Sequence, residues 1–445
     1  MGCGVVNDGV LVGIDAGTKR VKAVVVDLDG TELATTSAAT PWVVDGAKIE
    51  VDARTLADTA RSVLASAVAG CGRPVLGVGV TSVGESGVLL DTHGEPVSPI
   101  VAWYDQRGAV DRVKDALPDL AMRTGVPFNP IATVFKLAEL SPDELRGRRW
   151  LNVAEWVIHA LGGDQFAEIS LAGRTGMHDL HTGAWWPDAL ELLGVDDTLF
   201  PGDARLGVEG AGTASFSPIA GATLAVGGHD HQVAAFAVGA TDPGWHFESL
   251  GTADALTVAV SPPVAEATVS EIVDFGATIG RTVVSDRLIV IIGLRTGQIL
   301  DRITRLLGLA GAEERHAVSA RAAQLDAHPK LTVAFASGQL AISGIGEGIG
   351  PEQLWRAAVA AADDRTTDVT SRFERWFGEP DGVILGGGWL HDPAVEAATH
   401  RRFPSAVRTR FGEPGAVGAA AIAGIAAGVL DGPFTGAGRP ERSAS

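Results

Sequence analysis

Cysteine is scarce in this chain, which has two, Cys3 and Cys71, among 445 residues. Two cysteines cannot build a disulfide framework, and their spacing is not that of a metal site. We interpret both as structural thiols in a reducing compartment, and we expect the cytoplasm. The start of the chain lacks the basic and apolar regions of a leader, and the Ala/Gly-rich stretch 415–430 is short for a membrane span.

Basic residues are also few. Lys and Arg number 35 against 54 Asp and Glu, which gives a formal net charge of −19. This balance excludes a chain whose main task is to bind nucleic acid or an anionic membrane, because either needs a basic surface. The motifs GxxxxGK[ST], GxSxG and HExxH are absent as well. The absence of these motifs argues against a P-loop enzyme, a serine hydrolase and a zinc protease.

The chain has the composition of a globular protein, with 46% hydrophobic and 20% charged residues. Its length exceeds what one hydrophobic core usually supports, so we expect two domains. Strand patterns, such as a hairpin from Val88 to Asp91 that turns at His93 and Gly94, alternate with helix patterns, such as Pro351 to Phe377. This alternation indicates the α/β class. We place the domains at residues 1–240 and 241–445, because a strand-turn-strand pattern near the start returns just after residue 245.

The first strand-turn-strand pattern carries a polar tip. Strands are predicted from Val10 to Ile14 and from Val21 to Asp27, around the sequence Asp-Ala-Gly-Thr-Lys. Gly17 leaves room for phosphate oxygens to approach the backbone N–H groups and the Thr18 hydroxyl, and Asp15 is placed to hold Mg²⁺. Lys19 is compatible with anion binding. The alternative is an ordinary turn with a solvated aspartate, since such short motifs are common.

Two glycine motifs lie in the second half. Gly251 and Thr252 form the tip of a predicted hairpin from His246 to Val260, and they offer the same kind of backbone donors as the first tip. Gly386 and Gly387 follow a predicted apolar strand and would let adenine or ribose lie against the backbone. A tight turn between a strand and a helix explains them equally well.

Asp230 stands between the two tips, in the sequence Gly-Gly-His-Asp-His-Gln. A carboxylate there is able to accept the proton of an attacking hydroxyl during phosphoryl transfer. The alternative is that Asp230 caps a helix that begins near Gln232. His229 and His231 lack the further ligands of a zinc site.

In this order the motifs resemble those of the FGGY carbohydrate kinases, members of the actin-like, ribonuclease-H-like ATPase superfamily. The resemblance covers nearly the whole chain. It rests on segments 13–27, 79–91, 103–107, 135–137, 172–175, 227–232, 251–252, 386–388 and 415–420.

The resemblance implies two ribonuclease-H-like domains with a cleft between them, the first binding mainly sugar and the second mainly the nucleotide. It implies ATP and Mg²⁺ as cofactors and Asp230 as the catalytic base. Asp15 and Asp230 would hold the metal. The resemblance also assigns residues to the binding of substrate and of nucleotide. The substrate-side residues are Glu85, Trp103, Asp105 and Asp230; the nucleotide-side residues are Asp15, Gly17, Thr18, Lys19, Gly251, Thr252, Gly386 and Gly387.

We therefore expect a kinase that phosphorylates a sugar, polyol or sugar acid, with a xylulokinase-like substrate class favoured and a homodimer as the default assembly. An acid at position 85 disfavours an anionic substrate unless an arginine intervenes. Lys19 departs from the Ser or Thr usual in the family, and the segment 337–340 lacks its usual Gly-Glu-Arg-Thr-Pro run. These departures leave open a non-catalytic sensor of sugar or nucleotide with the same fold.

Overall fold

The computed structural model of the chain describes residues 8–251, 254–309, 311–326, 330–336 and 339–434. These residues form two compact units. Unit 1 contains residues 1–241, 261–290 and 413–445, and unit 2 contains residues 242–260 and 291–412. The predicted division after residue 240 lies where the chain first passes from unit 1 to unit 2. The chain later returns to unit 1 at residues 261 and 413, and these two returns were not predicted.

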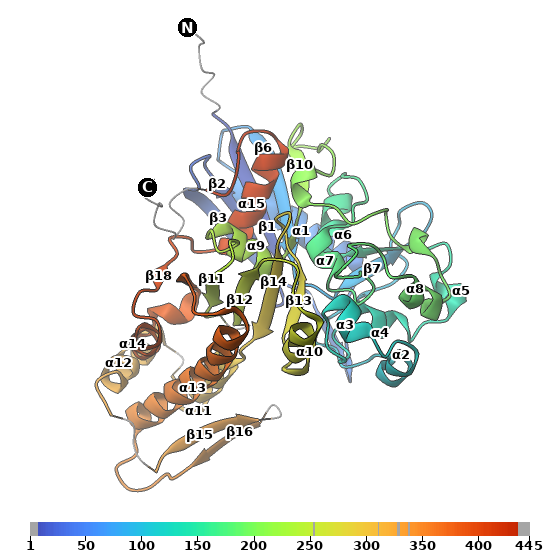
Figure 1. Ribbon diagram of the computed structural model, residues 1–445. Helices are drawn as coiled ribbons and strands as arrows, with labels where there is room; N and C mark the ends of the chain where they lie inside the picture. The colour runs from blue at the N-terminus through green and yellow to red at the C-terminus, as the bar shows by residue number, and fades with distance from the viewer. Residues whose placement is uncertain (1–7, 252–253, 310, 327–329, 337–338, 435–445) are drawn as a thin grey trace, which may run out of the picture. The chain divides into compact units, whose positions relative to one another are not determined.

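The main sheet of unit 1 has the strand order β10-β6-β1-β2-β3 (Figure 1). In that order the strands are Thr223–His229, Val75–Ser82, Val10–Ala16, Arg20–Val26 and Glu32–Ala39. β1 and β2 form the predicted antiparallel hairpin, β6 runs parallel to β1, and β10 runs parallel to β6. Successive side chains of a strand point to opposite faces of its sheet. Val10, Val12 and Ile14 of β1 accordingly enter the core cluster that also contains apolar side chains of α1 and α6.

The opposite face of this sheet is covered by α15, the last helix, drawn in red in Figure 1. The sheet bears glycines where the helix backbone approaches. A Cβ built on Gly13 would lie 1.7 Å from the carbonyl oxygen of Ala416, and one on Gly79 would lie 1.9 Å from that of Ala419. The final segment therefore returns to unit 1 because its small residues and these glycines permit contact between backbones.

A second core cluster occupies the helical middle third of unit 1 and includes Leu89, Phe135 and Trp186. The sequence indicated a hairpin from Val88 to Asp91 with a turn at His93 and Gly94. The turn is present, since Gly94 N–H donates to the Asp91 carbonyl at 3.0 Å. The hairpin closes after this turn, because Asp91 N–H donates to the Glu95 carbonyl and Val97 N–H donates to the Leu89 carbonyl, each at 2.9 Å. The strand, β7 (Gly87–Leu90), also pairs antiparallel with β9 (Arg149–Asn152), a partner that the sequence did not indicate.

Unit 2 repeats the sheet pattern of unit 1. Its strands lie in the order β14-β12-β11-β17-β18, where β11 and β12 are antiparallel, β17 is parallel to β11, and β18 is parallel to β17. The hairpin β11–β12 thus corresponds to β1–β2, and β17 corresponds to β6. The weak internal duplication predicted from the two glycine-bearing hairpins is confirmed at the level of topology.

The strands and helices of unit 1, in chain order, are β1 Val10–Ala16, β2 Arg20–Val26, β3 Glu32–Ala39, β4 Val43–Asp45, β5 Lys48–Val51, α1 Ala53–Val68, β6 Val75–Ser82, β7 Gly87–Leu90, β8 Ile100–Val101, α2 Val110–Ala116, α3 Leu120–Thr124, α4 Thr133–Leu137, α5 Pro142–Leu145, β9 Arg149–Asn152, α6 Val153–Ala160, α7 Ile169–Ala172, α8 Pro187–Leu193, β10 Thr223–His229, α9 Asp230–Ala237, α10 Glu266–Asp274, β13 Thr278–Arg281 and α15 Pro414–Ala426. The chain crosses to unit 2 within β14, Leu288–Gly293. Those of unit 2 are β11 Trp245–Ser249, β12 Ala255–Val260, α11 Thr296–Leu306, α12 Ala312–Ala322, β15 Thr332–Ala336, β16 Gln339–Ser343, α13 Pro351–Phe377, β17 Gly382–Gly386, α14 Pro393–Arg402 and β18 Val407–Arg408. Within the described ranges, none of the helices combines the length and the apolar character that crossing a bilayer requires.

The close approach of α15 to the sheet makes Gly79 sensitive to substitution. We expect Gly79→Ala to destabilise the protein by about 1–3 kcal/mol, because the added methyl group would overlap the Ala419 carbonyl. A thermal unfolding scan should show a melting temperature lower by several degrees. Gly280→Ala is the matched control, since a Cβ there meets open space. Equal melting temperatures for both variants would contradict this account of the packing.

Candidate functional site

Three parallel strands of unit 1 end at the same edge of the sheet. β1 ends just after Asp15, β6 ends three residues before Glu85, and β10 ends immediately before Asp230. In open α/β sheets, ligands bind beyond the carboxyl ends of the strands. The fold therefore brings together two residues of the predicted phosphate and metal site and one of the predicted substrate wall.

The turn after β1 is shorter than predicted, because β1 continues through Asp15 to Ala16. Gly17 N–H donates to the Arg20 carbonyl at 3.1 Å, which closes the turn. The Thr18 hydroxyl accepts a hydrogen bond from the Trp103 indole at 2.9 Å. The predicted phosphate turn and the predicted substrate wall are thus joined directly, while Lys19 is exposed at the tip.

Asp230 is the first residue of α9, not the residue that precedes the helix. His229 occupies the cap position and makes no capping bond with its side chain. The Asp230 carboxylate accepts a hydrogen bond from the His231 backbone N–H at 2.7 Å. The alternative in which Asp230 caps a helix starting near Gln232 is therefore wrong about the helix start, because the strand passes into the helix without a loop.

Asp15 and Asp230 lie in one electrostatic environment. Burial, together with the charge of Asp230, raises the pKa of Asp15 to about 7 against the opposing charge of Lys22. Burial and the charge of Glu85 likewise raise the pKa of Asp230 to about 7. The His231 N–H and the Arg174 charge act in the opposite direction. His229 lies 3.6 Å from Asp230, but burial lowers the pKa of His229, which keeps it neutral. Among the described residues, neither carboxyl group is paired with an arginine or lysine that would offset its desolvation.

The surroundings of Asp15 fit a bound cation. Its Oδ1 atom is buried without a hydrogen-bond partner, which leaves a carboxylate oxygen for a positive ligand. Across the described parts of the chain, no group of three or more His, Cys, Asp or Glu side chains is arranged to hold a metal. Two carboxylates suit Mg²⁺, which commonly takes one or two from the protein and its other ligands from water and phosphate.

The N-terminus of α15 adds to this region. A Cβ on Gly415 would lie 3.4 Å from Asp15 Oδ2, so the first turn of the helix reaches the strand end. Glu413 precedes the helix and forms an ion pair with Lys22 at 2.6 Å. Helix N-termini favour anions because their backbone N–H groups and dipole point outward. The sequence placed Gly415 in a family motif but gave no sign that it would meet Asp15.

A buried hydrogen-bond chain supports the backbone before Asp230. His229 N–H donates to the Ser170 hydroxyl at 2.9 Å, and this hydroxyl donates to Glu168 at 2.5 Å. Glu168 also accepts the N–H groups of Ser170 and Leu171, and its own N–H donates to Glu155 at 2.8 Å. Sequence reasoning missed this network because 59 positions separate His229 from Ser170, and Glu155 lies 13 positions before Glu168.

Glu85 is held in an uncommon conformation, with φ of 58°. Its carboxylate accepts hydrogen bonds from Arg174 Nε at 2.6 Å and from Nη2. Arg174 Nη1 donates in turn to the Thr278 hydroxyl. Both side chains are mostly buried, with 5% of Glu85 and 15% of Arg174 exposed. An arginine therefore does intervene at position 85, and the negative charge of Glu85 is countered within the protein.

Asp105 is fully buried and all its bonding capacity is used inside the protein. Its carboxylate accepts from Arg107 Nη2 at 2.7 Å and from the Ile49 N–H at 2.9 Å. Burial alone would raise the pKa of Asp105, but the Arg107 hydrogen bonds and charge, with the backbone donors, lower it to about 2. In this structure Asp105 anchors the segment that carries Trp103.

The predicted nucleotide motifs lie in unit 2. Thr252 and positions 337–338 fall outside the described residues. Gly251 is the last described residue after β11. Gly387 has φ of 102°, and a Cβ there would lie 2.4 Å from the Leu250 carbonyl oxygen. Leu250 N–H donates to the Gly386 carbonyl at 2.7 Å. The structure thus brings the two glycine motifs together and gives Gly387 a packing reason for being glycine.

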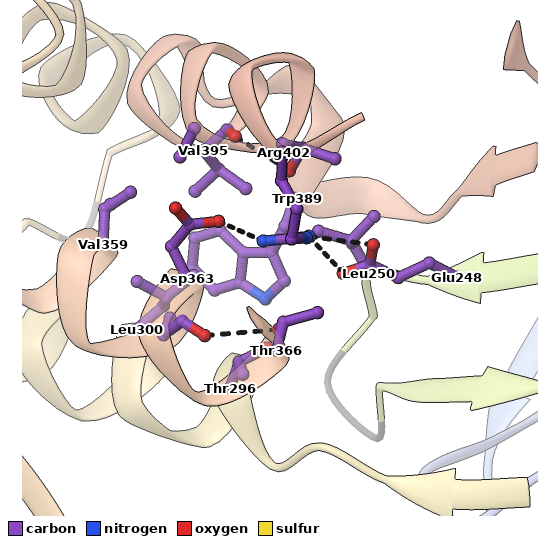
Figure 2. Close-up of a pocket in the computed structure, with 13 residues that line it drawn as sticks. Glu248, Leu250, Thr296, Leu300, Val359, Asp363, Thr366, Trp389, Val395 and Arg402 are labelled. Atoms are coloured by element: carbon purple, nitrogen blue, oxygen red, sulfur yellow. Dashed lines mark hydrogen bonds and ion pairs between the residues drawn. The ribbon is translucent and has the colours of Figure 1, made fainter. Parts of the chain in front are cut away.

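Unit 2 also contains a buried ion cluster, drawn in Figure 2. Arg402 Nη2 donates to both carboxylate oxygens of Glu248, at 2.8 and 2.9 Å, and Nη1 pairs with Asp363. A cavity of about 20 Å³ beside it has room for roughly one water molecule. Its lining consists of Glu248, Leu250, Thr296, Leu300, Val359, Ala362, Asp363, Thr366, Trp389, Val395, Ala398, Thr399 and Arg402. A nucleotide does not fit there, so we interpret the cluster as structural.

The buried Glu168 should make stability depend on pH. Burial raises its pKa to about 8, so the folded protein retains a proton that the unfolded chain releases above about 4.5. Unfolding then releases protons, and stability falls as pH rises through this interval, by at most about 1.4 kcal/mol per pH unit. We expect Glu168→Gln to weaken the fall in melting temperature between pH 5 and 8, whereas the exposed Glu191→Gln does not. An unchanged slope would contradict the assignment.

Removal of Arg402 should destabilise unit 2. Arg402→Met leaves Glu248 buried without its counter-charge, which typically costs about 3–5 kcal/mol. The neighbouring Arg401 is exposed, so Arg401→Met is the control. Thermal unfolding of the two variants should differ clearly, and adding Glu248→Gln to Arg402→Met should restore most of the loss. Equal stability of the Arg402 and Arg401 variants would show that the cluster contributes little.

Comparison with known sequences identifies relatives. Residues 10–237 match the N-terminal domain of the FGGY family of carbohydrate kinases. The chain is 29% identical over 254 residues to L-fuculokinase of Escherichia coli strain K12, covering 52% of each protein. It is 31% identical over 315 residues to xylulose kinase of Streptomyces rubiginosus, covering 67% of this chain and 63% of that one. The chain spans about half the length of the L-fuculokinases that it matches.

Comparison with solved structures agrees on the fold. The ligand-bound xylulose kinase from Lactobacillus acidophilus superimposes with a TM-score of 0.82 at 17% identity, covering 95% of this chain and 90% of that one. The predicted α/β class with two actin-like domains is thereby confirmed. Since the match to the family's N-terminal domain extends over more than half of the sequence, the chain belongs to the FGGY family of carbohydrate kinases.

Proposed function

We propose that the protein is an ATP-dependent carbohydrate kinase that transfers the γ-phosphoryl group of ATP to a hydroxyl of a sugar, polyol or sugar acid. The observation that supports this most strongly is the convergence of Asp15, Glu85 and Asp230 at the ends of three parallel strands. Beside them, the Thr18 turn is bonded to Trp103. A pair of uncompensated carboxyl groups is costly in a purely structural role, which favours an enzyme over a non-catalytic sensor.

Asp230 is proposed as the general base. Its pKa of about 7 suits a general base, because the group is partly deprotonated at neutral pH and still has a high affinity for a proton. The hydrogen bond from His231 N–H fixes one carboxylate oxygen, and the Ser170 hydroxyl fixes the backbone one residue earlier. The carboxylate is thus held by the strand end and by the helix start.

Asp15 and Asp230 would hold Mg²⁺, which when bound with ATP neutralises negative charge on the phosphates. Gly17 and Thr18 would bind phosphate oxygens through the turn, and the N-terminus of α15 would contribute positive potential near Asp15. The transition state of phosphoryl transfer is loose, so positioning and electrostatics should contribute more than the base. Gly251, Thr252, Gly386 and Gly387 remain the proposed nucleotide contacts of unit 2.

For the acceptor, we propose a xylulose-like ketose. The support comes from the xylulose kinases among the relatives and the solved structures. Glu85 and Trp103 would contact the sugar hydroxyls, while Asp105 would hold in place the segment that carries Trp103. Because Arg174 counters the charge of Glu85, sugar acids belong in the same substrate screen. A homodimer in the cytoplasm completes the proposal.

The base assignment is tested by Asp230→Asn. We expect the variant to fold and bind ATP but to lose about 10²- to 10⁴-fold in kcat, because the proton has no acceptor. The measurement is sugar-dependent ADP release, screened first with the unchanged protein over ketoses, polyols and sugar acids. Asp58→Asn, on the exposed face of α1, is the control. A kcat near that of the unchanged protein would contradict the base assignment, and no ADP release with any sugar would contradict the kinase proposal.

A further inference from the structure

Lys136 is a lysine in the short helix α4 whose ammonium group meets backbone carbonyls. Its Nζ donates to the Ala102 carbonyl at 2.8 Å and to the carbonyls of Glu85 and Trp103 at 3.3 Å each. An ammonium has three N–H donors, so these contacts match its full capacity. The three acceptors come from two separate loops, one after β6 and one after β8.

Both loops carry proposed substrate contacts. The first presents Glu85, whose positive φ is a strained conformation for a residue with a side chain. Arg174 holds the Glu85 carboxylate, and Lys136 holds the carbonyl of the same residue, so side chain and backbone are fixed separately. The second loop presents Trp103, whose indole is bonded to Thr18 and whose carbonyl accepts from Lys136.

We propose that Lys136 is a positioning residue that fixes the spacing between Glu85 and Trp103, and thereby the binding of the acceptor sugar. The expected effect of Lys136 on turnover rests on the proposed kinase function, whereas its expected effect on the two loops does not. Lys136 itself donates all its hydrogen bonds to the protein and acts through its neighbours. Its loss should weaken acceptor binding and leave the nucleotide side unchanged.

The positioning of the two loops by Lys136 depends on pH, because it depends on the charge of the ammonium group. Burial lowers the pKa of Lys136 to about 8, although Glu85 and Asp105 act to raise it; Arg107 adds to the lowering. Below about pH 8 the ammonium keeps three charge-assisted donors, and above that pH it loses one donor and the charge. Acceptor binding through this group is therefore complete below pH 8 and weakens as pH rises through it.

The kinetic test uses Lys136→Ala in the full chain, with the exposed Lys114→Ala as matched control. We expect the KM for the sugar to rise about 10- to 100-fold in the first variant, the range for losing charged hydrogen bonds, while the KM for ATP stays unchanged and kcat falls less. Propylammonium, which replaces the deleted atoms, should lower the sugar KM again, and propanol should not. The sugar KM of the unchanged protein should rise above pH 8, and that of Lys136→Ala should not.

A second measurement does not depend on activity. Hydrogen exchange should show lower protection of segments 84–89 and 100–106 in Lys136→Ala than in Lys114→Ala, with segment 20–26 unchanged. If no sugar supports ADP release, the kinase proposal fails while exchange still decides the role of Lys136. Unchanged protection of both segments, or a sugar KM equal to that of the control, overturns the positioning role.

Discussion

Contact between the backbone of α15 and the main sheet of unit 1 is the constraint on which the rest of this site depends. It requires glycine at Gly13 and Gly79, because any side chain there would overlap the helix carbonyls. The same contact places the first turn of α15 beside Asp15 and positions Glu413 against Lys22. A segment more than three hundred residues from β6 thus completes the end of the sheet where the proposed chemistry lies.

The protein treats its buried charges in two ways. Glu85, Asp105 and Glu248 are each held by an arginine, which offsets the cost of removing them from water. Within the described part of the chain, Asp15 and Asp230 are paired with no arginine, and both carry raised pKa values. Glu168 also has a raised pKa without an arginine, so a raised pKa alone does not mark the reactive groups. Asp15 and Asp230 differ from Glu168 because they lie at the carboxyl ends of β1 and β10, where ligands bind in open α/β sheets.

Sequence reasoning succeeded where the signal was local. The hairpin around Gly17, the hairpin β11–β12 and the helix Pro351–Phe377 follow from turn residues and hydrophobic periodicity within one segment, and the structure has them. The family resemblance supplied the order of the motifs and hence the fold. The site residues themselves stay proposals, although Asp15, Glu85 and Asp230 do converge at one edge of the sheet.

Long-range partners escaped the sequence. Lys136 and Arg174 stood in recognised motifs without a role, because nothing in a sequence tells which carbonyl or carboxylate a distant side chain will meet. Arg402 is paired with a residue 154 positions away, and β7 pairs with β9 in addition to forming the local hairpin. The start of α9 at Asp230 was missed for a related reason, since the tight passage from strand to helix depends on the Ser170 bond to His229.

The position of α15 at the end of the chain also has a consequence during synthesis. At roughly 5–20 residues per second, the strands of the first sheet leave the ribosome some tens of seconds before their covering helix does. During this time one face of the sheet is bare. At the helix contact that face presents Gly13, Gly77 and Gly79 beside apolar side chains such as Leu11, which packs against Gly424 of the helix. The nascent chain therefore keeps an apolar surface open until α15 has been made.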